Sequence, residues 1–327
     1  MTQAERFKKA LRREPIEGHC PTFELVFYLT LESIGRIHPL HQMYQLEQMS
    51  KQERKLHIDY AADTYIEIAE KYHHSAIFVH PNPADLDNTV RLLETIRDKT
   101  GDEYFLMIHG DPTFEIPAGN NMMAFAERMF EDKNGLKAEA ESRLQDRIDF
   151  ANALAQRKGL LDGFALCSDY CFNINPFYSP AMFSEFVAPY LERIIQAYHD
   201  RGFYSIKHTD GNIMPILDQI VDCKPDALHS LDPQGGVNLA EVKRLYGDRI
   251  ALCGNVNCGL LQTGKDEEVI ADVRRSLQQG MTGWGYIFCT SNCVYTGMPL
   301  ERYEMMNRVW REEGIYEIGV VQPENEV

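Results

Sequence analysis

The stretch YSIKHTDGNIMPILDQIVDCKPDALHSLD (residues 204–232) contains two short apolar runs, 204–210 and 226–232, separated by a helical pattern. Runs of the same kind alternate with helical patterns along the whole chain, at residues 20–27, 75–80, 103–110, 163–169, 250–255 and 285–290. Eight strands that each precede a helix are typical of a (β/α)8 barrel of the TIM type. An open doubly wound sheet is the alternative, but no GxGxxG fingerprint follows the first run. We therefore predict a (β/α)8 TIM barrel.

Several helices have recognisable boundaries. Residues 179–202 are predicted to form one helix, because Ser179 is a good N-cap, Pro180 suits the first helical position and Gly202 follows the pattern. Residues 1–14 have their apolar side chains on one helical face and predict an N-terminal helix.

The chain has 327 residues, which is long for one domain but ordinary for an α/β barrel. It shows no linker, low-complexity tract or internal repeat, so we expect a single domain over residues 1–327. Residues 28–50 form a long insertion after the first predicted strand. This insertion is expected to act as a lid or as a surface for a partner.

The net charge of −16 argues against nucleic acid and anionic membranes as partners. No run of eighteen apolar residues occurs, so no membrane span is expected. The charged N-terminal segment lacks the pattern of a signal peptide, and we expect a cytoplasmic protein. Eight cysteines are too few for a disulfide scaffold, which leaves core packing, metal binding or reactivity as their roles.

Chemistry in such barrels lies where the strands end and in the loops that follow. The predicted ends carry mainly ionisable and thiol side chains: Glu24, His80, His109, Asp111, Asp169, Tyr170, His208, Asp210, His229, Asp232, Cys253, Asn255, Cys289 and Cys293. Zinc takes thiolate, imidazole and carboxylate ligands. We predict a zinc site whose four ligands come from consecutive strand ends, namely His208, Asp232, Cys253 and Cys293.

Each cysteine also has a simpler interpretation, because free cysteine is among the most buried residue types. Cys20 and Cys223 are expected to pack in the core, and Cys258 is expected to be a loop residue without a role. Cys253 and Cys293 are favoured as ligands because neighbouring strands end beside them.

Three segments together resemble the uroporphyrinogen decarboxylase superfamily. They are KHTDGN…NVNCG (207–259), GYIFCTSNCVYTGMPLERYEMMNRV (285–309) and AERFKKALRREP (4–15). That superfamily includes decarboxylases, cobalamin-independent methionine synthases and zinc methyltransferases that act with corrinoid proteins. Its true decarboxylases carry an RQAGRY segment that grips the substrate's carboxylates, whereas this chain reads FELVFYLTLESIGR at residues 23–36. The resemblance therefore favours the zinc methyltransferase branch.

The zinc methyltransferases use a histidine-x-cysteine pair at the fifth strand and a cysteine at the eighth. The methionine synthase branch adds a glutamate at the sixth strand. This chain matches with His208, the acidic Asp232 and Cys293, and it departs at Asp210, where a cysteine is expected. Either Cys253 replaces the missing thiolate or Asp210 itself ligates the metal. A related group that cleaves aryl ethers is described with one carboxylate and two cysteines, and Asp232, Cys253 and Cys293 fit that set.

The resemblance implies methyl transfer from a small methylated substrate, foremost an aryl methyl ether (O-demethylation), to the cobalt of a corrinoid (cobalamin) carried by a partner protein. The departing phenolate needs a metal or a general acid. Candidate acids are Asp210, Asp169 and Tyr170. Three alternatives stay open: methyl transfer from the corrinoid to a thiol, a metal-free decarboxylase in which Asp210 and His208 move protons, and a non-catalytic barrel that binds a ligand or a corrinoid protein.

Overall fold

The computed structural model describes residues 1–41 and 48–316. Its centre is a parallel sheet of seven strands, in which each strand pairs with the next along the chain. The strands are β2 (Ala76–Val79), β3 (Phe105–His109), β4 (Gly163–Leu166), β5 (Tyr204–His208), β6 (Ala227–His229), β7 (Ala251–Cys253) and β8 (Tyr286–Ile287). This order is the one that the predicted barrel requires.

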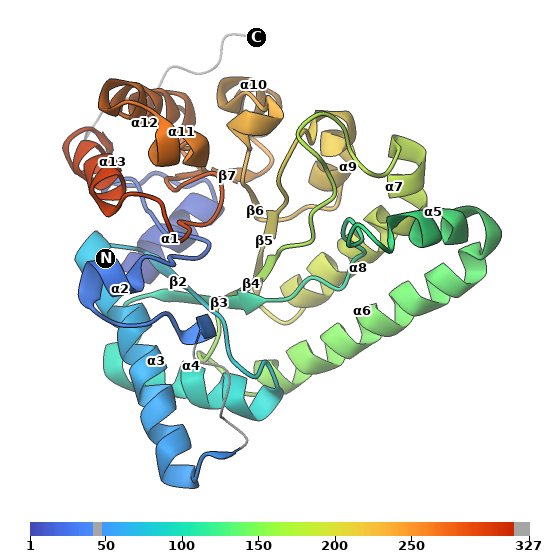
Figure 1. Cartoon of the computed structure of the whole chain (residues 1–327), viewed down its shortest axis with the longest axis horizontal. Coiled ribbons are helices and arrows are strands. Elements are labelled where there is room, and N and C mark those ends of the chain that lie inside the picture. The colour runs from blue at the N-terminus through green and yellow to red at the C-terminus, as the bar shows by residue number, and fades with distance from the viewer. Residues whose placement is uncertain (42–47, 317–327) are drawn as a thin grey trace.

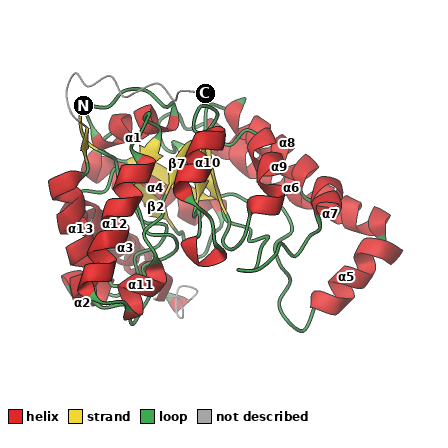
Figure 2. Ribbon diagram, turned by 90° about the horizontal axis from the view of Figure 1, so that it is seen from above, coloured by secondary structure: helices red, strands yellow, loops and turns green. Residues whose placement is uncertain are grey.

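Helices surround the curled sheet on its outer side (Figures 1 and 2). In chain order they are α1 (Gln3–Leu11), α2 (Thr30–Ile34), α3 (Lys51–Tyr72), α4 (Leu86–Thr100), α5 (Met122–Glu131), α6 (Lys133–Ala155), α7 (Pro180–Phe186), α8 (Ala188–His199), α9 (Leu217–Asp222), α10 (Leu239–Tyr246), α11 (Cys258–Thr263), α12 (Asp266–Gly280) and α13 (Leu300–Glu313). The architecture is α/β and resembles a TIM barrel. None of the helices among the described residues is long and apolar enough to cross a membrane.

The sheet does not close into a complete barrel, and the strand predicted at residues 20–27 is absent from the described structure. This segment instead makes single hydrogen bonds to both edges of the sheet: Phe288 N–H donates to Pro21 O at 2.9 Å and Ser75 N–H donates to Thr22 O at 2.6 Å. Pro21 has no N–H to give to a ladder, which is a physical reason for the irregular backbone.

The helix predicted over residues 179–202 is correct at its start and wrong in its continuity. Ser179 Oγ accepts a hydrogen bond from Met182 N–H at 3.3 Å, as an N-cap should. The helix then breaks at Val187 into α7 and α8. Pro189 explains the break, because its ring clashes with the preceding turn and it lacks an N–H.

Two short strands join distant parts of the chain. β1 (Gly18–His19) pairs antiparallel with β9 (Ile315–Tyr316), so the beginning of the chain lies beside residues close to its other end. Within the predicted insertion at residues 28–50, the structure shows α2 and one turn of 3-10 helix at Pro39–His41. Residues 42–47 of that insertion lie outside the described residues.

Candidate metal centre

Two carboxylates and one imidazole meet beyond the ends of β4 and β5. His208 is the last residue of β5, and its Nε2 lies 3.7 Å from Asp169 Oδ1 and 3.8 Å from Asp210 Oδ1. One ligand atom from each of the three residues lies within 4.8 Å of the other two, and no other such group of three or more is found among the described residues. Sequence analysis placed all three at strand ends, selected His208 as a ligand, gave Asp210 as the alternative to Cys253, and gave Asp169 only as a candidate acid.

Asp210 is held tightly, yet one of its oxygens has no partner. Asn292 Nδ2 donates to Asp210 Oδ2, and the Asp210 N–H donates to Asp169 Oδ1 at 2.9 Å. Asp210 Oδ1 is buried and makes no hydrogen bond of standard geometry among the described residues, and neither does the buried Ser230 Oγ, whose hydroxyl is near enough to lower the pKa of Asp210. A buried carboxylate oxygen in that state calls for a proton or a cation.

The electrostatics of the group point the same way. Burial, and then the charge of Asp169, raise the pKa of Asp210 to about 7. Burial lowers the pKa of His208 to about 4, so the imidazole supplies no compensating charge at neutral pH. A divalent cation among these three side chains would stabilise both carboxylates in their charged form, and their donor set suits zinc.

Cys293 lies near this group. Its pKa is raised to about 12, first by burial and then by the charge of Asp210. The thiol is half-buried. A bound cation would reverse this effect and favour the thiolate. Of the four predicted ligands, His208, Cys293 and Asp232 thus interact with Asp210, and Cys253 does not contribute to its pKa.

The structure does not bring the predicted set His208, Asp232, Cys253 and Cys293 together. Asp232 is engaged by the backbone: its Oδ1 accepts from Gln234 N–H at 2.8 Å and its Oδ2 from Gly211 N–H at 3.2 Å. It therefore caps the 3-10 turn Pro233–Gly235 and holds the turn after β5.

Cys253 is fully buried in β7. Burial raises the pKa of its thiol, and the Cys20 thiol raises it further. This position is typical of a core cysteine. Cys258 also differs from its expected place, because it is the first residue of α11 and its Sγ contacts Cys293 O at 3.8 Å.

Tyr170 belongs to a second buried network. Its hydroxyl bonds to Thr113 Oγ1 at 2.6 Å, and Lys207 Nζ lies 4.0 Å from the centre of its ring. Lys207 Nζ donates to Asp111 Oδ2 at 2.7 Å, and both side chains are fully buried. Burial raises the pKa of the Tyr170 hydroxyl well above its usual range.

Sequence analysis missed Lys207 and Asn292. A lysine inside an apolar strand is a usable signal, because a buried ammonium requires a carboxylate partner. Asn292 gave no signal of its own, since its role depends on a contact with a side chain 82 positions earlier in the chain.

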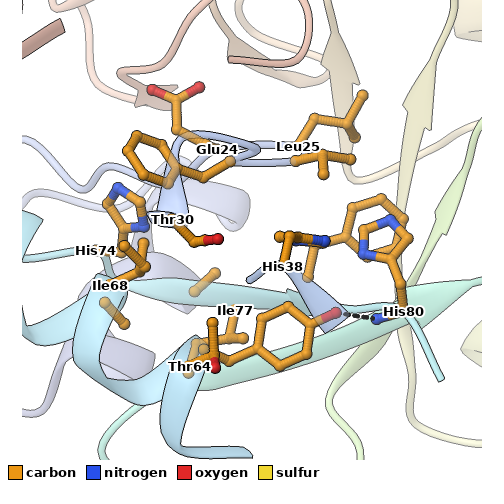
Figure 3. Close-up of a pocket in the computed structure, with 15 residues that line it drawn as sticks. Glu24, Leu25, Thr30, His38, Thr64, Ile68, His74, Ile77 and His80 are labelled. Carbon is orange, nitrogen blue, oxygen red and sulfur yellow. Dashed lines mark hydrogen bonds between the residues drawn. The ribbon is translucent and has the colours of Figure 1, made fainter. Parts of the chain in front are cut away.

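A separate small cavity lies between α3, β2 and the segment that follows β1 (Figure 3). Its volume is about 30 Å³, which accommodates water but not an organic substrate. Glu24, His38, His74 and His80 line it, and none of the three metal-centre residues does. The Glu24 carboxylate points away from the middle of this cavity and accepts hydrogen bonds from Thr290 (Figure 3).

Comparison with known proteins supports the fold and the family. Residues 172–312 match the uroporphyrinogen decarboxylase (URO-D) family. A methyltransferase from Methanosarcina mazei superposes with a TM-score of 0.73 at 17% identity, covering 95% of this chain and 99% of that one. A putative vitamin-B12-independent methionine synthase from Listeria monocytogenes gives 0.50 at 12% identity, covering 91% of this chain and 97% of that one.

None of the curated proteins matches the sequence significantly. The low identities of the superposed structures establish a shared fold. The family match contains the 207–259 block that carried most of the resemblance in the sequence. Over residues 172–312 the chain is therefore similar to the uroporphyrinogen decarboxylase family, in agreement with the resemblance seen in the sequence.

Proposed function

We propose that this chain is a zinc-dependent methyltransferase with its centre at Asp169, His208 and Asp210. One observation carries the proposal: three ligand atoms converge within 4.8 Å, and the buried Asp210 Oδ1 has no partner among the described residues. Such a group fits a metal site better than a structural network, because structural networks satisfy their buried oxygens.

Asp169, His208 and Asp210 would hold the zinc, with the Cys293 thiol as a further ligand from the eighth strand's loop. When bound, zinc supplies Lewis acidity toward a leaving oxygen. Asn292 keeps the Asp210 carboxylate in place through its Oδ2. In the metal-free state Asp210 holds a proton close to neutral pH, since its pKa is about 7.

The substrate and partner follow from the resemblance and from what the chain lacks. The first-strand segment 23–36 has a single arginine, Arg36, and that residue pairs with Glu67 at 2.6 Å, so it does not offer a cluster for a polycarboxylate. We propose a small methylated substrate, foremost an aryl methyl ether, and a corrinoid protein as methyl acceptor. The similarity to a methyltransferase fold supports this choice over porphyrinogen decarboxylation.

A metal-free decarboxylase acting on another acid is the second candidate. The raised pKa of Asp210 favours it, because a carboxylic acid that is protonated near pH 7 can deliver a proton to a carbanion. This reading needs no metal and predicts that chelators leave activity unchanged.

Metal analysis and a methyl-transfer assay separate the two candidates. Protein purified without chelator should contain about one zinc per chain, and should methylate cob(I)alamin from an aryl methyl ether. Asp210→Asn and Cys293→Ala should lose most of the metal, whereas Cys253→Ala serves as the matched cysteine control and should keep it. Methyl transfer that survives complete removal of metal would overturn the proposal.

A further inference from the structure

The two histidines at the ends of β5 and β6 form a direct pair. His208 and His229 are cross-strand partners in the parallel ladder, so their side chains lie on the same face of the sheet. His208 Nδ1 and His229 Nδ1 are 2.7 Å apart, and both rings are buried. One of these two nitrogens must carry the hydrogen and the other must accept it.

The other nitrogen of His229 decides which one. His229 Nε2 lies 3.2 Å from the carbonyl oxygen of Thr290, which can only accept a hydrogen bond. His229 Nε2 therefore carries the hydrogen, and in a neutral ring Nδ1 is then an acceptor. The ring is neutral because it is completely buried without a carboxylate against it. Consequently His208 Nδ1 is the donor, and His208 Nε2 keeps its lone pair.

That lone pair faces the carboxylates. His208 Nε2 is the atom that lies 3.7 Å from Asp169 Oδ1 and 3.8 Å from Asp210 Oδ1. Without a hydrogen on Nε2, the imidazole presents an electron pair toward the two carboxyl groups. This is the state in which an imidazole ligates a metal, and metal-binding histidines usually have their second nitrogen fixed by a neighbour.

Thr290 is itself fixed. Its N–H and its hydroxyl both bond to Glu24 Oε2, and its hydroxyl also bonds to Asn292 O. Two residues later, Asn292 Nδ2 holds Asp210. The same loop therefore orients both the histidine and one carboxylate of the centre.

We propose that His229, held by the Thr290 carbonyl, is a positioning residue that keeps His208 in the Nδ1–H tautomer and presents Nε2 to the metal. The metal-binding part of this inference rests on the proposed function, whereas the tautomer does not. We call the hydrogen-bonded chain from the Thr290 carbonyl through His229 to His208 the histidine relay. Neither Thr290 nor His229 is proposed to touch the substrate. The histidine relay acts by setting which nitrogen of His208 is free.

Nitrogen NMR of metal-free protein labelled with ¹⁵N-histidine tests the relay. The signals of His208 are identified by their loss in His208→Gln. We expect a protonated Nδ1 and an unprotonated Nε2 in the wild type. Asn at position 229 retains an acceptor near His208, so His229→Asn should preserve this tautomer, whereas His229→Leu should convert His208 to the Nε2–H form.

Zinc titration provides the second measurement. We expect His229→Leu to weaken zinc binding about 10–100-fold, and His229→Asn to weaken it less. A wild-type His208 in the Nε2–H form would overturn the relay, as would a folded His229→Leu with unchanged tautomer and zinc affinity. If His229→Leu does not fold, the wild-type spectrum alone still decides. If the Nδ1–H tautomer is found but no zinc binds, the relay stands and the metal function falls.

Discussion

Asp111, which follows β3, and Asp210, which follows β5, are two carboxylates at the same end of the sheet with opposite surroundings: Asp111 is fully buried and Asp210 is partly exposed. Asp111 accepts hydrogen bonds from Lys207 Nζ at 2.7 Å, Ser168 N at 3.0 Å, and Thr113 N and Oγ1 at 2.9 and 2.6 Å. Asp210 Oδ1 accepts none among the described residues. Burial opposes the charge of Asp111, but the Lys207 ammonium outweighs it and lowers the pKa to about 2, whereas the pKa of Asp210 rises to about 7.

This difference indicates a structural role for Asp111 and a ligand-binding role for Asp210. The Asp111 carboxylate has its own cation and a full set of donors, so the fold is complete around it without a ligand. Asp210 lies beside Asp169 and His208, and no lysine or arginine among the described residues forms an ion pair with it. A fold that places two carboxylates together in this way sacrifices stability unless something else binds there.

Removing Lys207, the cation that pairs with Asp111, should have the largest effect on the free energy of unfolding. Lys207→Met leaves Asp111 charged and buried, and we expect it to lower the free energy of unfolding by about 3–5 kcal/mol in urea. Lys133→Met removes an exposed partner of Glu185 and should cost less than about 1 kcal/mol. Adding Asp111→Asn to Lys207→Met should restore part of the loss. Equal effects of the two lysine variants would contradict the comparison.

Adding zinc should stabilise the folded protein by binding to Asp169, His208 and Asp210. Zinc at about 100 times its dissociation constant should raise the free energy of unfolding of the wild type by about 2.7 kcal/mol, and that of Asp210→Asn by much less. Thermal unfolding of chelator-treated protein, with and without zinc, measures this. Equal stabilisation of both proteins would place the zinc elsewhere.

The contributions of Asp210 and Asp111 to the free energy of unfolding should also change with pH in opposite directions. Asp210 has a folded pKa of about 7, above its ordinary value of 3.8, so the folded state binds more protons between those values. Its contribution to the stability of metal-free protein therefore falls as pH rises through that window, by at most about 1.4 kcal/mol per pH unit. Asp111, with a lowered pKa, stabilises above its ordinary value and loses this only as pH falls toward 2.

Unfolding curves of the metal-free wild type and of Asp210→Asn, measured at several pH values, give the pH dependence that Asp210 contributes. The asparagine variant should gain stability relative to wild type between pH 5 and pH 7, on the order of 1–2 kcal/mol. A difference that is constant with pH would mean that Asp210 is not the titrating group.

Tyr170→Phe should have the smallest effect. It removes one hydrogen bond to Thr113 from the completed network, so we expect a loss of about 1 kcal/mol in stability and little change in methyl transfer. A loss of activity of about 100-fold or more would restore Tyr170 as the general acid that the sequence suggested.

The order of strands and helices was predictable because alternation and capping are local properties. Seven predicted strands are present, whereas the first is wrong because Pro21 interrupts the ladder that its apolar neighbours suggest. The helix at 179–202 was predicted as one element since Pro189 follows an otherwise continuous pattern. Both errors come from giving hydrophobic periodicity more weight than a single proline.

The candidate site was predictable in its location but not in its membership. His208 is the last residue of β5 and Asp210 follows it by two positions, so the alternation that predicted them on one face placed them together correctly. Whether Cys253 or Asp169 joins them depends on how far each strand extends and which way its last side chain points. The structure buries Cys253 completely within β7, and no local pattern distinguishes such a cysteine from one that faces the end of the strand.

The β1–β9 pair has a consequence for how the chain is made. Gly18 pairs with Tyr316, so this ladder cannot form until almost 300 further residues have been added. At about 5–20 residues per second, the ribosome takes roughly 15–60 s over that interval. Until β8 has been made, the segment after β1 can bind only the β2 edge, and Cys20 lacks the Tyr286 carbonyl that it contacts in the folded chain. The protein should therefore depend on chaperones during synthesis, more than its stability once folded would suggest.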